Sequence, residues 1–188
     1  MLNVPVTLQA VDRRINSANP SRTGIIGNDW LDPLTGQPEY CAGDTSASYI
    51  GHATNALDGT SPKNLKVETL GDVLRRVDPR SKVIGISGKD RGAILPAGKS
   101  GVAYMYMGAS GQFASTTHYM PAHPAWVNAF NPASCRRASG KDNGPTIDSR
   151  CGPSAVIAAI NEVGVRNASH VAARILSRNC CMSLVVRS

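Results

Sequence analysis

A chain of 188 residues with 41% hydrophobic content is long enough to bury a core, and we expect one main domain. The formal net charge of +7 comes largely from residues 132–188, and no basic run alternates with aromatic residues, so a DNA- or RNA-binding protein is not indicated. No window is apolar and long enough to span a membrane, and the first residues lack the pattern of an export signal. We therefore expect a cytoplasmic protein without a membrane partner.

The five cysteines are an odd number and form no CxxC pair. This count and spacing predict neither a disulfide framework nor a zinc ribbon, and reduced thiols in a cytosol fit them best. The adjacent Cys180 and Cys181 leave open a site for a soft metal or a crosslink between two chains. We assign no cysteine a catalytic role.

The middle of the chain alternates helical patterns with short apolar runs, which is typical of α/β architecture. Residues 69–77 carry apolar side chains at helical spacing and predict a helix with one apolar face. The run SKVIGIS at 81–87 predicts a short buried strand, and VAYMYM at 102–107 predicts another. The KDR triplet at 89–91 follows the first of these strands, at the edge where open α/β sheets place their ligands. It is the most favourable position for a site in the chain.

The remaining segments predict loops and a separate tail. Pro and Gly punctuate two stretches that we expect to be surface loops, 28–41 and 94–101. Residues 132–152 lack apolar periodicity and predict a linker. Two short helices are expected at 153–163 and 168–178, and the last residues, 182–188, resemble an edge strand able to pair with this sheet or with a second copy.

Four stretches follow one another along the chain: PSRTGIIGNDWLDPLTGQPEYC, SPKNLKVETLGDVL, SKVIGISGKDRGAIL and GQFASTTHYMPAHPAWVNAFN. Together they resemble the alkaline phosphatase superfamily over about residues 18–131, in the branch with a threonine nucleophile that is also similar to type I phosphodiesterases and nucleotide pyrophosphatases. The resemblance implies a truncated, partial α/β/α sandwich formed by residues 1–131. Residues 153–188 would then form an unrelated helical tail that packs on this domain or on a second subunit.

The resemblance implies that Asn28, Lys89 and Arg91 hold the oxygens of a phosphoryl group. The chemistry is suited to that role, because a guanidinium can bind two phosphate oxygens at once and an ammonium adds a point charge. An arbitrary KDR triplet would more often be a set of surface charges. The family's nucleophilic threonine lies 21 residues before this asparagine, which leads to Thr7, although the residues that follow Thr7 depart from the family pattern.

The family binds two zinc ions through Asp and His residues, and none of those ligands can be carried over to this sequence. A replacement site for zinc or manganese could use His118, His123 and Asp44, because imidazole and carboxylate groups bind such ions. The spacing of the two histidines across a proline is not a recognised ligand motif. Histidines that are simply hydrogen-bonded or exposed remain the alternative.

These features predict a metal-dependent phosphoric ester hydrolase, most of all a phosphodiesterase acting on cyclic nucleotides or activated aryl diesters, with a metal-activated water or Thr7 as nucleophile. We expect a homo-oligomer, since a partial sheet would leave apolar surface to cover. Two alternatives stay open. One is a module that captures phosphate or nucleotides without turnover, and the other is a nonfunctional fragment.

Overall fold

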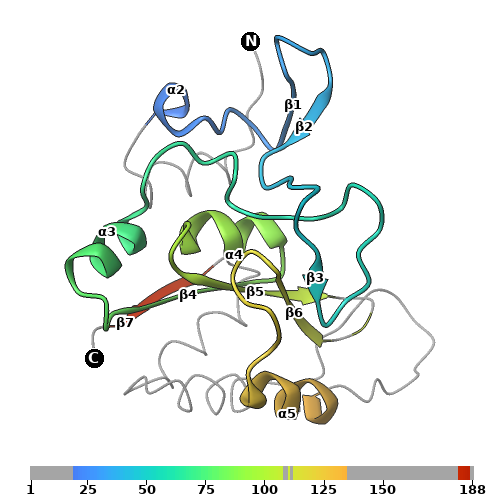
Figure 1. Cartoon of the computed structure of the whole chain (residues 1–188), viewed down its shortest axis with the longest axis vertical. Helices are drawn as coiled ribbons and strands as arrows, with labels where there is room; N and C mark the ends of the chain where they lie inside the picture. Colours follow the sequence, from blue (N-terminus) through green and yellow to red (C-terminus); the bar gives the residue numbers. More distant parts are fainter. Residues whose placement is uncertain (1–18, 108–109, 111, 135–181, 187–188) are drawn as a thin grey trace.

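The computed structural model describes residues 19–107, 110, 112–134 and 182–186. Figure 1 shows the elements in chain order, coloured along the sequence. They are α2 (Pro20–Thr23), β1 (Asp29–Leu31), β2 (Pro38–Tyr40), β3 (Tyr49–Ile50), α3 (Leu70–Val77), β4 (Lys82–Ser87), α4 (Asp90–Ala97), β5 (Val102–Met107), β6 (Gln112–Thr116), α5 (Ala125–Ser134) and β7 (Met182–Val186). Among the described residues, no helix is both long and apolar enough to cross a membrane.

A mixed five-stranded sheet in the order β3-β6-β5-β4-β7 is the centre of the fold. Strands β4 and β5 are parallel and are joined through α4, while the other neighbours pair antiparallel. The carboxyl ends of β4 and β5 therefore meet at one edge of the sheet, as expected for an α/β crossover. The two strands predicted from SKVIGIS and VAYMYM are confirmed, and so is the mixed α/β class.

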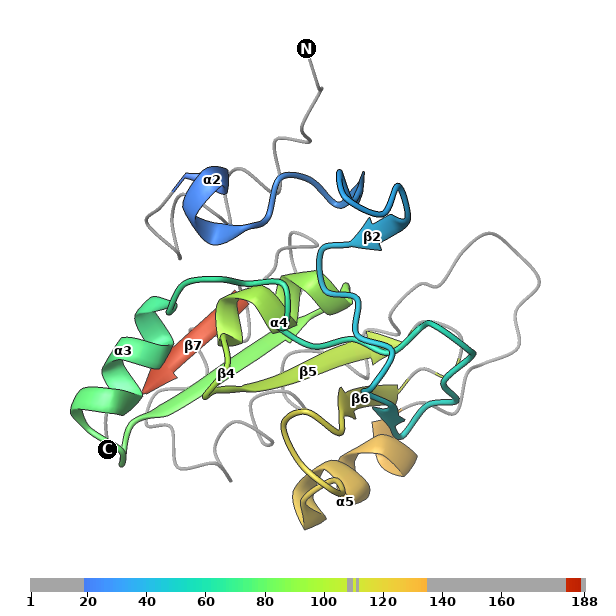
Figure 2. The same cartoon turned by 45° about the horizontal axis from the view of Figure 1, so that its top comes forward.

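Helix α4 is buried between two layers (Figure 2). On the sheet side, Gly85 of β4 lies against Ala93, so close that a Cβ atom on Gly85 would overlap the Ala93 carbonyl. On the opposite side, Leu95 packs in a cluster formed by residues of the N-terminal layer, Ile25, Cys41 and Leu65. The small residues of α4 thus let a strand and a second layer approach the same helix, which explains why every residue from 92 to 97 is buried.

The surface loop predicted at 94–101 is wrong, because α4 continues through Ala97. Pro96 lacks an N–H and would disfavour the interior of a helix, but it stands in the last turn of this one. Burial of Ile94 and Leu95 outweighs the missing hydrogen bond. The helix ends at Gly98, whose positive φ of 68° and close approach to Thr69 and Asp72 both favour a residue without a side chain.

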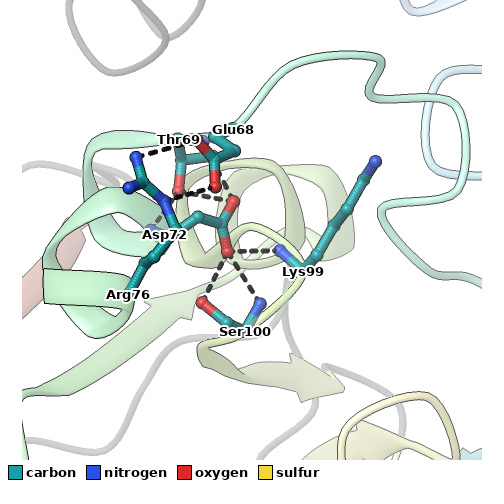
Figure 3. Close-up of polar contacts among 6 residues, drawn as sticks. All are labelled: Glu68, Thr69, Asp72, Arg76, Lys99 and Ser100. Atoms are coloured by element: carbon teal, nitrogen blue, oxygen red, sulfur yellow. Dashed lines mark hydrogen bonds and ion pairs between the residues drawn. The ribbon is translucent and has the colours of Figure 1, made fainter. Parts of the chain in front are cut away.

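The helix predicted at 69–77 is confirmed as α3, with Thr69 as its N-cap. Its apolar face is only partly buried, since Leu70 and Val77 are 65% and 67% exposed and the other two apolar residues of that face are half-buried. Gly71 and Asp72 are buried. Figure 3 shows why. The Asp72 carboxylate accepts hydrogen bonds from Thr69, from the backbone of residue 99 and from Ser100, so a polar network fixes α3 to the end of α4.

The stretch 28–41, predicted to be a loop, contains a two-stranded antiparallel hairpin of β1 and β2. Asp32 accepts hydrogen bonds from the backbone N–H groups of residues 34 and 35, which closes the tip of the hairpin. At the other end of the chain, the predicted edge strand is present as β7, which pairs antiparallel with β4 at the sheet edge. The predicted linker and tail helices lie outside the described residues, and the division into domains stays a prediction.

Candidate functional site

The candidate site lies at the carboxyl end of β4, where the chain turns from the sheet into α4. Ser87 ends the strand, and its hydroxyl accepts a hydrogen bond from the backbone N–H of Lys89 at 3.1 Å. Lys89 is the N-cap residue of α4, and its side chain is exposed. The first N–H groups of a helix lack partners within the helix and carry partial positive charge. This turn therefore presents an ammonium group beside backbone donors.

Arg91 is positioned by Tyr40, a residue of β2 that stands 51 positions earlier in the chain. The Tyr40 hydroxyl accepts a hydrogen bond from Arg91 Nη1 at 3.2 Å and donates one to Asp90 Oδ1 at 2.7 Å. Burial, with the nearby charge of Asp90, raises the pKa of Tyr40 above its ordinary value. The phenol therefore stays protonated and holds the acid and the arginine together.

Asn28 is connected to the segment that carries Tyr40 by a backbone hydrogen bond of the hairpin. Its carbonyl accepts a hydrogen bond at 2.8 Å from the N–H of Cys41, the residue that follows Tyr40. The hairpin is fixed there, because the Asn64 side chain donates to the Tyr40 carbonyl at 2.9 Å. Among the described residues, the buried side-chain oxygen of Asn28 has no hydrogen-bond partner. An amide oxygen can only accept, so a phosphoryl oxygen would have to be held by the amide nitrogen of Asn28.

The three residues predicted to grip phosphate thus come from two segments, with Asn28 beside the hairpin and Lys89 and Arg91 at the start of α4. Tyr40 links the segments. Among the described residues, Arg91 donates a hydrogen bond to Tyr40 through one guanidinium nitrogen. A guanidinium carries five N–H groups, so the other donors can contact a ligand. The arrangement can bind a tetrahedral anion through charge-assisted hydrogen bonds from several directions.

Cys41 lies next to this cluster but is not a reactive thiol. It is fully buried, and burial together with the charge of Asp90 raises its pKa to about 12. A thiol with that pKa is almost entirely protonated at neutral pH and is a poor nucleophile. Its side chain instead packs with Ile25 and Leu95 in the core between α4 and the N-terminal layer.

Asp44, predicted as a metal ligand, is held by neighbouring hydroxyl groups. Its Oδ1 accepts from the Ser46 hydroxyl and its Oδ2 from the Ser61 hydroxyl, both at 2.6 Å. Burial by itself raises the pKa of Asp44, but these hydrogen bonds outweigh burial and bring the pKa below its ordinary value. The carboxylate fixes the turn at 44–46 to residue 61.

The two histidines of the predicted metal site differ in their surroundings. His118 is exposed and makes an edge contact with the Tyr119 ring, with 4.7 Å between ring centroids. Both ring nitrogens of His123 are buried, and neither has a hydrogen-bond partner among the described residues. Burial lowers the pKa of His123, and the nearby backbone of Ile50 offsets this in part. His123 is therefore predominantly neutral at pH 7.

Within residues 19–107, 110, 112–134 and 182–186, no three or more His, Cys, Asp or Glu side chains gather closely enough to hold a metal ion. The set of His118, His123 and Asp44 therefore does not form a ready coordination shell in that part of the chain. The metal role of these residues stays a prediction. The same holds for the nucleophilic role of Thr7, which lies outside the described residues.

The sequence analysis assigned no role to Tyr40 or Asp90. Asp90 could have been given one, since it stands between the lysine and the arginine of the KDR triplet, where a carboxylate beside a cation can orient it. Tyr40 gave no such signal. It occurs in an apparent loop, and only the folding of the hairpin over α4 brings its hydroxyl to Arg91.

The fold and the site define an α/β protein with a candidate anion site beyond the carboxyl end of a parallel strand, where open α/β sheets bind their ligands. Sequence comparison finds alkaline phosphatase PhoV of Synechococcus elongatus, 50% identical over 115 residues, which are 60% of this chain and 20% of PhoV. A calcium-transporting ATPase of Myroides odoratus is 44% identical, and alkaline phosphatase PafA of Elizabethkingia meningoseptica is 40% identical, each over 114 residues. These last two matches each cover 60% of this chain and 21% of the relative. No family model matches the chain.

The solved structure of wild-type PafA superposes on 85% of this chain and 39% of its own, with a TM-score of 0.58 and 25% identity over this wider region. These findings confirm the resemblance to alkaline phosphatases, a family of phosphoric ester hydrolases, and the likeness of the fold to a part of theirs. The chain spans about a fifth of the length of the curated relatives that it matches.

Proposed function

We propose that this chain binds the phosphoryl group of a phosphoric ester at the start of α4 and hydrolyses the ester, with a preference for diesters. The observation that carries the proposal is the Tyr40–Asp90–Arg91 contact, which fixes a guanidinium beside Lys89 and close to the hairpin segment of Asn28. Without an anionic ligand, this convergence of cationic and amide donors would leave much hydrogen-bonding capacity unused.

A variant of PafA supports the choice of residues. Its crystal structure carries replacements of a threonine, an asparagine, a lysine and an arginine. The lysine and the arginine are separated by a single residue, as Lys89 and Arg91 are here, and the interval from threonine to asparagine equals that from Thr7 to Asn28. We propose that the four positions correspond, which makes Thr7 the candidate nucleophile, with an activated water as the alternative.

In this proposal the protein acts by positioning and by electrostatic stabilisation. Arg91 would contact two phosphoryl oxygens, and Lys89 would neutralise charge that spreads over those oxygens in the transition state. The Tyr40 hydroxyl keeps the Arg91 fork in one orientation, so less freedom is lost when the ester binds. Asn28 would donate its amide to an oxygen. A diester carries one negative charge, which the two positive charges of Lys89 and Arg91 more than offset.

A divalent ion, zinc or manganese, is the cofactor that the relatives imply, and it would polarise a phosphoryl oxygen and activate the attacking group. The described residues do not supply a set of three ligands for it. We therefore assign no step to the ion and keep His118, His123 and Asp44 only as ligands to be tested. We also propose a homo-oligomer, since Leu31, Leu70 and other apolar side chains are exposed.

Capture of phosphate without turnover is the second candidate function. It needs only Asn28, Lys89 and Arg91, all of which lie in the described part of the chain, whereas hydrolysis also needs a nucleophile. The two functions share one site and differ in whether the ester bond is broken.

Hydrolysis of 4-nitrophenyl phosphate mono-, di- and triesters tests the proposal, on pure protein that has been chelated and then supplied with zinc or manganese. Diester hydrolysis that depends on the metal and is lost in Lys89→Ala and Arg91→Ala is the expected result. Binding of inorganic phosphate, followed by ³¹P NMR, is measured in parallel. Phosphate binding without turnover would support capture alone, and the absence of both would contradict the site.

A further inference from the structure

The hairpin of β1 and β2 has two faces, and its pairing register assigns each side chain to one of them. Side chains of directly paired residues lie on the same face of an antiparallel ladder, and the face alternates along each strand. One face carries four side chains that come from two direct pairs, Asp29 with Tyr40 and Leu31 with Pro38. The intervening pair, Trp30 with Glu39, lies on the opposite face.

The backbone hydrogen bonds show that the first face is closely packed across the hairpin. The N–H of Cys41 donates to the carbonyl of Asn28, and the N–H of Asp32 donates to the carbonyl of Gln37. Because bonded pairs alternate with non-bonded ones, the pairs at 29–40 and 31–38 are the non-bonded kind, whose side chains approach each other most closely. Pro38 suits this position, since it has no N–H to donate. The four side chains therefore form one continuous surface.

Tyr40 joins this surface to the candidate phosphate site. Its hydroxyl contacts both Asp90 and Arg91 at the start of α4. Figure 2 shows β2 over the amino-terminal part of that helix. Pro38 stands two residues before Tyr40 on β2, about 7 Å away at roughly 3.4 Å per residue. Leu31 and Pro38 thus extend the face of Tyr40 from the phosphate site toward the tip of the hairpin.

The extension is apolar and open to solvent. Leu31 is 66% exposed, and its partner Pro38 is exposed as well. A single exposed leucine is ordinary on a protein surface. Leu31 differs by its place, because it pairs with a second exposed apolar residue on the face whose tyrosine supports Arg91. An organic group esterified to a phosphoryl group at Arg91 could cover this pair.

Charge restricts the kind of group that suits this face. Asp29 is exposed and lies directly across from Tyr40. Burial raises the pKa of Cys41 most, and the charges of Asp90 and Asp29 add to it, so the negative potential of Asp29 reaches the neighbour of Tyr40. Residues 24–62 contain no lysine or arginine to offset that charge. A second anionic group on the ligand would be repelled here, whereas a neutral one would not.

We propose that the hairpin face of Leu31 and Pro38 binds one of the two organic groups of a phosphodiester. The site would then select diesters with a neutral, apolar aryl or alkyl group over esters that carry a second anionic group. This inference rests on the proposed phosphoester function and specifies its substrate class. The phosphoryl group stays with Lys89 and Arg91, and Leu31 determines specificity without taking part in the chemistry.

Calorimetric titration of the full chain with dimethyl phosphate and diphenyl phosphate, with and without zinc, tests the apolar contact. Diphenyl phosphate should bind more tightly than dimethyl phosphate. Leu31→Ser should weaken diphenyl phosphate about fivefold, because the ring loses apolar surface to cover, and should leave dimethyl phosphate unchanged. Leu70→Ser is the matched control, since Leu70 is 65% exposed on α3, and it should change neither affinity. Pro38→Ala is the second variant if Leu31→Ser does not fold.

Bis(4-carboxyphenyl) phosphate tests the role of charge. It should bind more weakly than diphenyl phosphate, and Asp29→Asn should improve its affinity about threefold, as expected for removing one exposed like charge. Glu39→Gln removes a charge from the opposite face of the same hairpin and should leave the difference between the two ligands as it is. An equal improvement in both variants would mean that the hairpin repels anions in general, and would contradict selection by this face.

The two proposals fail in different ways. Equal affinity for the two neutral diesters, or normal diphenyl phosphate affinity in both Leu31→Ser and Pro38→Ala, would overturn the hairpin contact and leave the phosphate site in place. Arg91→Ala should weaken both diesters alike, and normal diphenyl phosphate binding in this variant would show that the rings bind without the phosphoryl contact. No binding of either diester to the unaltered chain would overturn the phosphate site itself. A smaller particle mass in Leu31→Ser, with unchanged diester affinity, would assign Leu31 to a contact between copies instead.

Discussion

The two ends of α4 carry polar clusters of opposite character. At its carboxyl end, the Asp72 carboxylate accepts five hydrogen bonds, two from Thr69, two from Ser100 and one from the backbone of residue 99. At its amino end, Arg91 donates a hydrogen bond to the Tyr40 hydroxyl through one guanidinium nitrogen, and the Lys89 side chain is exposed. A cluster whose hydrogen-bonding capacity is filled holds the fold together, whereas one with donors to spare is suited to a ligand.

Arg91→Ala should reduce the rate of diester hydrolysis more than any other change, because it removes the guanidinium group that would hold two phosphoryl oxygens. Loss of one preorganised donor to a transition state costs on the order of 100-fold or more in turnover. Diester hydrolysis by the metal-supplied protein is the measurement. Arg76→Ala, on the surface of α3 and paired with Glu68, should hydrolyse the ester at the normal rate. Equal rates in the two variants would remove the phosphate site from the start of α4.

Asp72→Asn should lower stability without changing the affinity for phosphate. The amide that replaces the carboxylate cannot accept all five hydrogen bonds and turns a donor toward other donors, which costs about 2–3 kcal/mol. Urea unfolding gives the free energy, and ³¹P NMR gives phosphate affinity. Glu68→Gln, in an exposed pair, serves as the control and should change stability little. A loss of phosphate affinity in Asp72→Asn would show that the two ends of α4 are coupled.

Tyr40→Phe should weaken phosphate binding by roughly tenfold, as expected for losing a hydrogen bond that orients a charged group. The ring packs as before, and only the bridge between Asp90 and Arg91 is lost. We expect the change in KM, with kcat less affected, because the hydroxyl positions Arg91 and does not touch the reacting atoms. Tyr104→Phe is the matched control, since no hydrogen bond of its hydroxyl occurs in the described structure. If Tyr40→Phe bound phosphate normally, Arg91 would not need this support.

Acidification should destabilise the protein through the Asp72 cluster at the carboxyl end of α4. Burial raises the pKa of Asp72, but hydrogen bonds from Ser100 and Thr69 outweigh burial, and the net pKa lies below its ordinary value. A carboxyl with a lowered folded pKa contributes stability above its unfolded pKa of about 3.9, and that contribution is lost as pH falls through the folded pKa. The free energy of unfolding should therefore drop below about pH 4, and less steeply in Asp72→Asn. Identical pH profiles would mean that Asp72 adds no pH-dependent stability.

His118→Ala and His123→Ala should lower the amount of bound zinc or manganese if these residues are ligands. This is the smallest effect we expect, because His118 is exposed and the described residues complete no three-ligand group. Metal content by mass spectrometry after dialysis is the measurement. Normal content in both variants would direct the search to ligands in other parts of the chain.

The strands and the site position could be predicted because each depends on local pattern. SKVIGIS is a continuous apolar run, and a KDR triplet beyond it marks the ligand edge of an open sheet. The end of α4 could not be predicted, because Pro96 and Gly98 are locally typical of a loop and only burial on both sides keeps residues 94–97 helical. The buried face of α3 was also not evident, since it follows from a carboxylate network and not from apolar spacing.

By itself, the sequence determined the mixed α/β class, the resemblance to alkaline phosphatases and the candidates for holding phosphate, since all three depend on residue identities and short-range spacing. Only the tertiary structure decided which polar groups meet. Tyr40 and Arg91 are 51 residues apart, and their contact exists because a hairpin packs against α4. Tertiary packing also brings Ser61 to Asp44 and Ser100 to Asp72, so both carboxylates accept hydrogen bonds that stabilise the fold. A local sequence pattern does not predict such long-range hydrogen bonds, because they depend on distances in space.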